Sequence, residues 1–237
     1  MPTLLALDTA GDTCTLALMR DGAVDLAGGL PGQNHLEHVM PMIEQLLQRN
    51  GLEPEGCDAF AFGSGPGAFT GLRVACTIAQ GLAFGAGRPV IAVGNLPALA
   101  RRAARQAASP APCRVLAVID ARLNQVYWSV LDVTDGICTE RAPASLCDAA
   151  QLADIALQWQ PQLCAGRAPS LPALAGQGGW EVCEAVAGAG DIVQMAAWSL
   201  ARGEVLQADR AAPLYVRDQV ARTVQQRRAG AAAADAA

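Results

Sequence analysis

Short apolar runs separated by turn residues open the chain and predict three consecutive strands. Residues 3–8 form an apolar run that ends in Asp8, and residues 13–19 alternate as a half-buried strand does. Asp21-Gly22 is a hairpin signal, and residues 23–28 return as a third strand. The chain therefore begins with a three-stranded meander.

Helical spacing and buried strands alternate along the residues that follow. Asn34 is a candidate N-cap for a helix over 36–49, where apolar residues recur at intervals of three and four. Pro41 lies inside this pattern and predicts either a kink or a later helix start. The same analysis predicts strands at 58–62 and 89–93 and helices at 71–84 and 95–107.

The second half of the sequence echoes the first. Segments 4–18 and 114–131 each read as an apolar strand, an Asp at its end, a short turn and a second strand. A duplicated α/β fold accounts for this echo, although two such units also arise by chance. With a Pro-rich linker at 109–112 and a helix at 191–202, the predicted division is an N-terminal lobe over 1–108, a C-terminal lobe over 109–222 and a disordered tail over 223–237.

Composition describes a folded protein with few cationic side chains. Of 237 residues, 52% are hydrophobic and 16% are charged, which is enough apolar material for a sizeable core. The net charge is −5 and all 17 basic residues are Arg, so a Schiff-base or P-loop lysine is excluded and tight RNA binding by this chain alone is disfavoured. Neither a signal peptide nor a membrane-spanning run is evident, so we expect a cytoplasmic protein with no membrane partner.

Cysteine and histidine offer little chemistry in this sequence. The eight Cys contain no Cys-x-x-Cys pair, which is typical of reduced, buried thiols. His35 and His38 can share one helical face, but a metal site needs a third ligand from elsewhere. They also read as polar groups in the first turn of an exposed helix, and we therefore expect no metal site.

The strongest local signal is the glycine-rich segment from Gly63 to Arg73, which joins a buried strand to a helix. Glycines and a helix N-terminus together favour anion binding, so one interpretation is a phosphate cradle. The other is a tight strand-to-helix turn packed against a neighbouring element. The segment lacks the Gly-Lys-Ser/Thr of a Walker A loop.

Asp8 and Asp120, at two strand ends, could hold a hydrated Mg²⁺ between two lobes. The turn after Asp8 is small enough for a phosphate to approach, whereas Ala121-Arg122-Leu123 puts bulky side chains after Asp120. We therefore expect a degenerate nucleotide site and no ATP hydrolysis by this chain alone. Its candidate residues are Asp8, Thr9, Gly63, Gly65, Gly67 and Asp120.

The predicted helix over 71–84 is apolar around most of its circumference and contains several small residues, which permit close helix approach. Such a helix is either internal or covered by a partner. The sequence alone leaves both readings open.

Five segments together resemble the TsaB family, also called YeaZ. They are LLALDTAGDTCTLAL, the helix around His35, AFGSGPGAFTGLRVACTIAQGLAFGAGRPVIAVGNLPALA, VLAVIDARLNQVYWSV and APLYVRDQVA, and they run from about residue 3 to residue 222. The resemblance implies an actin-like ASKHA fold, in which two α/β lobes are each built on a mixed sheet with flanking helices.

The resemblance also implies a non-catalytic role in threonylcarbamoylation of the tRNA adenosine beside the anticodon. The family binds and activates TsaD, the catalytic paralogue, and a TsaE-like ATPase joins the complex. Asn95 and Leu99 stand where TsaD carries a pair of metal-binding histidines, so catalytic residues and cofactors are expected on another chain. The resemblance allows Mg-ATP to bind in the complex, implies contact with tRNA through the complex, and allows the isolated chain to pair with a second copy.

The family is further expected to dock through its two N-lobe helices, here 36–49 and 71–84. The interface candidates are Val39, Met42, Ile43, Leu46, Leu72, Val74, Ala75, Ile78 and Leu82, without an assignment of which face inward.

Two other functions stay open from the residues alone. A free-standing actin-like ATPase or small-molecule kinase would need a working Mg-nucleotide site, and a metalloprotease would need a metal site that His35 and His38 cannot complete. Near the C-terminus, Arg217, Arg222, Arg227 and Arg228 form either an RNA-contacting cluster or a solvated end.

Overall fold

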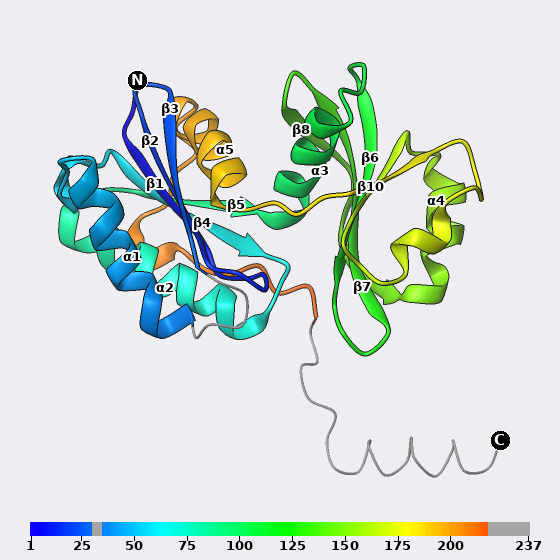
Figure 1. The fold of residues 1–237 in the computed structure, drawn as a ribbon, viewed down its shortest axis with the longest axis horizontal. Helices are drawn as coiled ribbons and strands as arrows, with labels where there is room; N and C mark the ends of the chain where they lie inside the picture. The colour runs from blue at the N-terminus through cyan, green and yellow to red at the C-terminus, as the bar shows by residue number, and fades with distance from the viewer. Residues whose placement is uncertain (30–34, 218–237) are drawn as a thin grey trace, which may run out of the picture.

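The computed structural model describes residues 1–29 and 35–217. Within them, two five-stranded sheets form two lobes (Figure 1). The first sheet contains β1 (Leu4–Asp8), β2 (Thr15–Arg20), β3 (Ala23–Gly28), β4 (Ala59–Gly65) and β5 (Val90–Gly94). The second contains β6 (Cys113–Asp120), β7 (Gln125–Thr134), β8 (Ile137–Asp148), β9 (Leu163–Gly166) and β10 (Glu181–Glu184).

The two sheets have the same topology. Their strand orders are β3-β2-β1-β4-β5 and, read from the opposite edge, β8-β7-β6-β9-β10. In each sheet the first strand pairs antiparallel with the second and parallel with the fourth, as β1 does with β2 and β4, and β6 with β7 and β9. Asp8 and Asp120 therefore close equivalent strands. The duplication and the two-lobe, mixed-sheet actin-like fold are confirmed.

Five helices cover these sheets. They are α1 (His35–Arg49), α2 (Phe69–Ala86), α3 (Asn95–Gln106), α4 (Leu152–Trp159) and α5 (Ala189–Ala201). In the first lobe, β1 turns Leu5 and Leu7 into a core shared with α1 and α2, and turns Leu4 and Ala6 into a core shared with α5. Because both faces are covered, the strand reads as a continuous apolar run.

Two helices cross between the lobes. Helix α3 follows β5 of the first sheet, yet its apolar side packs on the second sheet together with Val115 and Leu131. Helix α5 follows β10 of the second sheet, yet Ile192 and Val193 pack on the first. In Figure 1 both helices lie between the two sheets. The predicted division at residue 108 put α3 in the N-terminal lobe and α5 in the C-terminal lobe, whereas the apolar face of each helix is buried on the sheet of the other lobe.

The observed element ends correct several predicted bounds. Helix α1 begins at His35 and runs through Pro41, so the predicted later start is wrong. Asn34 lies outside the described residues. Helix α2 continues past Gly85 because the left-handed residue that ends it is Gly87, with φ 64°. The predicted tail, with Arg222, Arg227 and Arg228, also lies outside the described residues.

Candidate functional site

Strand ends of the first lobe bring together most of the predicted nucleotide-site residues. Asn95, the first residue of α3, accepts a hydrogen bond from the Gly65 N–H through Oδ1 at 3.0 Å. A Cβ at Gly63 would lie 2.9 Å from both Asn95 Oδ1 and Asp8 Oδ1. Asp8 Oδ1 also accepts the Ala10 N–H at 2.9 Å, which fixes the turn after β1. Asp8, Gly63, Gly65 and Asn95 are therefore neighbours.

The glycines of the segment face atoms of this same chain. A Cβ at Gly65, where φ is +122°, would lie 2.8 Å from the Leu214 carbonyl oxygen, and one at Gly67 would lie 2.8 Å from Ala10 Cβ. At Gly71 a Cβ would overlap the carbonyl oxygen of Thr9, whose hydroxyl donates to the Gly71 carbonyl at 2.6 Å. Of the two sequence-based interpretations, this geometry fits the packed turn and does not fit an open phosphate cradle.

Two backbone N–H groups of the segment also have hydrogen-bond acceptors within the chain. The Gly65 N–H is used by Asn95, and the Ala68 N–H donates to the Ala10 carbonyl at 3.0 Å. Ala68 is the N-cap of α2, so its N–H is one of the donors that a bound anion would need. The loop after β1 satisfies it instead.

In the second lobe, Asp120 is engaged by the turn that follows it. Asp120 Oδ1 accepts the Arg122 N–H at 2.8 Å, and Arg122 Nη1 lies 3.3 Å from Asp120 Oδ2. Arg122 Nη2 lies 3.6 Å from Asp12 of the first lobe. The bulky turn predicted after β6 is therefore present, and a guanidinium occupies the space beside Asp120. Because the Arg122 side chain is 78% exposed, these ion pairs contribute little stability.

Sequence analysis missed the structural role of residues 211–217, which connect the lobes. The Leu214 N–H donates to the Ser64 carbonyl at 2.7 Å in the first lobe. Arg217 Nη2 donates to the Ala121 carbonyl at 2.9 Å and to Gln125 Oε1 at 2.8 Å in the second. This segment lies directly over Gly65. Because these residues form no helix or strand, they show no hydrophobic periodicity from which the contacts could be predicted.

The outer helices place most of the predicted interface residues inside the protein. Six of the nine candidates are buried in the chain's own core: Val39, Ile43, Leu46, Leu72, Val74 and Ala75. The interface prediction is therefore corrected for Val39, Ile43, Leu46, Leu72 and Ala75, whereas Val74, at 8% exposure, still lines a hollow on α2. Met42, Ile78 and Leu82 pack against the core and stay partly exposed.

Other side chains occupy the outer face of α1 and α2. Met40 is exposed on α1, and Phe84, at 83%, is almost fully exposed on α2. Thr77 and Gly81 are also exposed on α2, and no atom lies within 4 Å of a Cβ built at Gly81. A hollow of about 330 Å³ opens on the same helix. It is lined by Phe69, Thr70, Arg73, Val74, Thr77 and Ile78.

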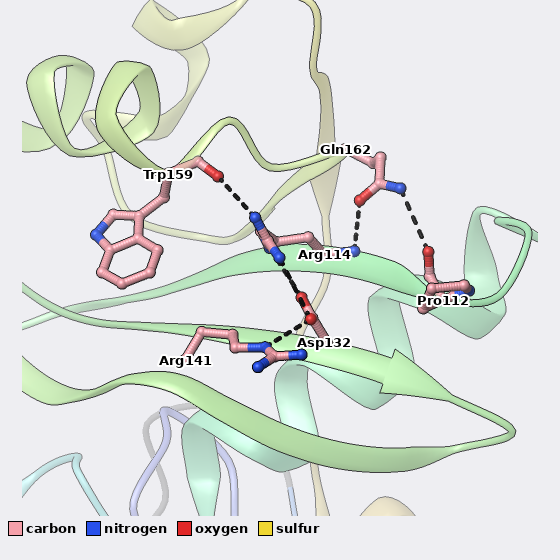
Figure 2. A network of polar contacts seen from close by, with 6 residues as sticks. All are labelled: Pro112, Arg114, Asp132, Arg141, Trp159 and Gln162. Atoms are coloured by element: carbon pink, nitrogen blue, oxygen red, sulfur yellow. Dashed lines mark hydrogen bonds and ion pairs between the residues drawn. The ribbon is translucent and has the colours of Figure 1, made fainter.

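A second hollow, of about 280 Å³, lies on the C-terminal lobe beside Pro112 and Arg114. Figure 2 shows that its polar groups bind one another: Arg114 Nε lies 2.8 Å from Asp132 Oδ1, and Arg141 Nε lies 2.7 Å from Asp132 Oδ2. These bonds hold the pKa of the Asp132 carboxyl below its ordinary value, and the bond from Arg114 has the largest effect. The network is internally satisfied and is a structural feature of the lobe.

The interface between α3 and α5 contains a buried acid. Asp191 is only 2% exposed, and its carboxylate lies 3.3 Å from Arg102 Nη1 and 3.6 Å from Arg105 Nη2. Its Oδ2 also accepts the Gly188 N–H at 3.3 Å and so caps the start of α5. Beside it, burial lowers the pKa of the Arg101 guanidinium, which stacks 5.0 Å from the Trp198 ring.

Across residues 1–29 and 35–217, no three His, Cys, Asp or Glu side chains gather as metal ligands. His38 is exposed on α1, and the His35 side chain is not described. None of the helices described is both long and apolar enough to cross a membrane.

Comparisons with known proteins decide the family. The family model described as "TsaD: tRNA N6-adenosine threonylcarbamoyltransferase" matches residues 29–170. The chain is 47% identical over 129 residues to the tRNA threonylcarbamoyladenosine biosynthesis protein TsaB of Haemophilus influenzae, and 42% identical over 126 residues to that of Escherichia coli. The solved structure of YeaZ from Pseudomonas aeruginosa superposes with a TM-score of 0.77 at 33% identity, covering 91% of this chain and 100% of that one.

The chain belongs to the TsaB (YeaZ) family. The matched regions cover 54% and 53% of this chain, and the chain spans about half the length of these curated relatives, 52% and 53%. These relatives are named for tRNA threonylcarbamoyladenosine biosynthesis.

Proposed function

We propose that the chain is a non-catalytic subunit that binds and activates a TsaD-type threonylcarbamoyltransferase. The observation that carries the proposal is the outer face of α2. This face exposes Phe84, Thr77 and Gly81, which no other described part of the chain covers, although the opposite side of the helix packs on the core. An exposed apolar helix face with small residues allows a second helix to approach closely.

The glycine-rich segment supports the non-catalytic part of the proposal. Gly65, Gly67 and Gly71 are packed on Leu214, Ala10 and Thr9, and Arg122 lies against Asp120. The chain's own atoms fill the space beside these glycines, and a guanidinium lies beside the Asp120 carboxylate. The alternative of a free-standing actin-like ATPase or kinase therefore has the weaker support. Calorimetry of the purified chain with Mg-ATP tests it, since micromolar binding that is lost in Asp8→Asn would revive the alternative.

Further parts of the proposal concern the assembly. A TsaE-like ATPase joins the complex, and the complex as a whole contacts tRNA. The isolated chain pairs with a second copy of itself through the same helices. A net charge of −5 agrees with a chain that does not hold tRNA by itself. In the cell, such a complex works in the cytoplasm.

Binding and activation can be tested with variants of exposed residues. Thr77→Arg and Phe84→Arg place a long cation on the outer face of α2 without entering the core. Leu157→Arg is the matched control, because Leu157 is also exposed, at 51%, but lies on α4 of the other lobe. We expect the α2 variants to lose co-purification with the TsaD-type subunit and to lose stimulation of threonylcarbamoylation, whereas the control keeps both. Unchanged binding by both α2 variants, with normal circular dichroism, would refute the proposed surface.

A further inference from the structure

An arginine on α2 is held by two aromatic rings from distant parts of the chain. The Arg73 guanidinium carbon lies 3.9 Å from the centroid of the Phe69 ring and 5.9 Å from that of Tyr215. Its Nε donates to the Tyr215 hydroxyl at 3.0 Å, and the two rings lie 5.5 Å apart. Arg73 is exposed, but stacking and the hydrogen bond restrict its orientation.

Arg73 lacks the acidic partner that most other exposed arginines here possess. Arg49 pairs with Asp25, and Arg202 pairs with Glu204. In the part of the chain that the structure describes, no carboxylate pairs with Arg73, and its one side-chain hydrogen bond uses Nε. The N–H donors of Nη1 and Nη2 are therefore free to form the two parallel bonds that a carboxylate accepts.

The hollow of about 330 Å³ adjoins this guanidinium and is otherwise apolar or weakly polar. Phe69 and Val74 form its apolar wall, and Thr70, Thr77 and Ile78 complete it. Among the described residues, Arg73 is the only charged one that lines it. The hollow is continuous with the outer face of α2, so a helix lying on that face reaches both the hollow and the cation.

We propose that Arg73 and this hollow form the recognition centre of the docking surface, and that they take an Asp or Glu of the partner helix next to an apolar side chain. This inference rests on the proposed function, since it names the chemistry by which the partner is recognised. A buried ion pair of bidentate geometry at the centre of an interface is typical of residues whose removal strongly weakens binding.

The alternative ligand for an exposed arginine beside aromatic rings is a nucleic acid. Stacked bases need an open ring face, and Arg73 already covers one face of Phe69 at 3.9 Å. Phosphate tracking needs several cations, yet Arg73 is the sole basic residue of α2, and Glu44 is exposed on the neighbouring α1. The observations therefore favour an acidic protein helix.

The test measures binding of the full chain to the TsaD-type subunit by calorimetry at low and high salt. Arg73→Gln should weaken binding roughly tenfold to a hundredfold and reduce its salt dependence. Arg73→Lys should recover only part of this loss, because an ammonium cannot form the two parallel bonds. Tyr215→Phe should weaken binding by a few fold, since it frees Arg73 without removing its charge. Arg88→Gln is the matched control, because Arg88 is exposed just beyond the end of α2 and outside the hollow.

The outcomes separate the two proposals. If Thr77→Arg abolishes binding while Arg73→Gln and Arg73→Lys bind as the wild type does, the recognition centre is refuted and the docking face stands. If the wild-type chain does not bind the TsaD-type subunit at all, the proposed function fails. A loss of tRNA binding in Arg73→Gln, with unchanged binding to the protein partner, would overturn the acidic-helix assignment. Acids on the partner helix whose substitution is non-additive with Arg73→Gln in a double-mutant cycle would identify the paired carboxylate.

Discussion

A pair of identical substitutions on α2 tests how the glycine-rich segment is packed. Gly71 and Gly81 lie on the same helix, but within residues 1–29 and 35–217 only Gly71 of the two faces another part of the chain. A methyl group at Gly71 would overlap the Thr9 carbonyl oxygen and lie 2.7 Å from the Thr9 carbonyl carbon and 3.1 Å from Ala10 Cα. These are backbone atoms, so no rotamer change can remove the clash.

The expected magnitude follows from three contributions. Overpacking of this kind costs about 1–3 kcal/mol. The clash also strains the bond from the Thr9 hydroxyl to the Gly71 carbonyl, at 2.6 Å, whose loss costs about 1 kcal/mol. Replacing a helical glycine by alanine returns about 1 kcal/mol. Gly71→Ala should therefore lower the free energy of unfolding by about 1–3 kcal/mol, whereas Gly81→Ala should raise it by about 1 kcal/mol.

Thermal unfolding followed by far-UV circular dichroism measures both effects. At this chain length about 1 kcal/mol shifts Tm by roughly 2–4 °C, so the two variants should move Tm in opposite directions. A Gly71→Ala protein as stable as the wild type would show that the segment is not packed on Thr9, and the argument against an open phosphate cradle would fail with it.

Three further predictions concern charges and thiols. Asp191→Ala should lower the free energy of unfolding in urea by about 1–2 kcal/mol, because the Gly188 N–H loses its cap and the half-exposed Arg102 and Arg105 lose their counter-ion. Asp191→Asn keeps an oxygen for the Gly188 N–H and should cost less, and equal losses would contradict the capping role. Burial raises the pKa of Cys14, Cys57 and Cys138 from 9.0 to about 11, so the protein should unfold more easily as pH rises from 9 to 11. At lower pH the native protein should react slowly with a thiol reagent, and rapid labelling of all eight thiols without denaturant would contradict this. Bonds from Arg114 and Arg141 lower the pKa of Asp132, so the stability they confer is present above its ordinary value of 3.8 and is lost as pH falls through the lowered value. In Asp132→Asn the free energy of unfolding should depend less on pH in this range, and an unchanged pH profile would refute the prediction.

The repeated arrangement of strands could be predicted because the local spacing of apolar residues shows it. Apolar runs ending in Asp8 and Asp120, each followed by a short turn and a returning strand, identified β1 and β6 and their partners. The exchange of α3 and α5 was not predictable in this way. An amphipathic pattern shows that a helix has a buried face, but it does not show which of two sheets will cover that face.

The same limit explains the correction to the interface residues. Val39, Ile43 and Leu46 were selected by their spacing of three and four, and this spacing marks the side of α1 that faces its own sheet. Apolar residues out of phase with the core, such as Met40 on α1 and Phe84 on α2, were the available signal for an outer surface. The role of residues 211–217 depends on contacts with residues more than a hundred positions away, such as Arg73 and Gln80, and no local pattern carries such information.

The crossing of α3 and α5 has a consequence for fragments of this chain. A fragment cut between α3 and β6 would keep α3 without the sheet that α3 covers, and its own sheet would lose α5 and expose Leu4, Ala6 and Ile91. The complementary fragment would carry α5 with no surface to bury Ile192 and Val193. Neither half is a self-sufficient folding unit, so expressing the two lobes separately should yield insoluble or unfolded polypeptides that recover native structure only when co-expressed.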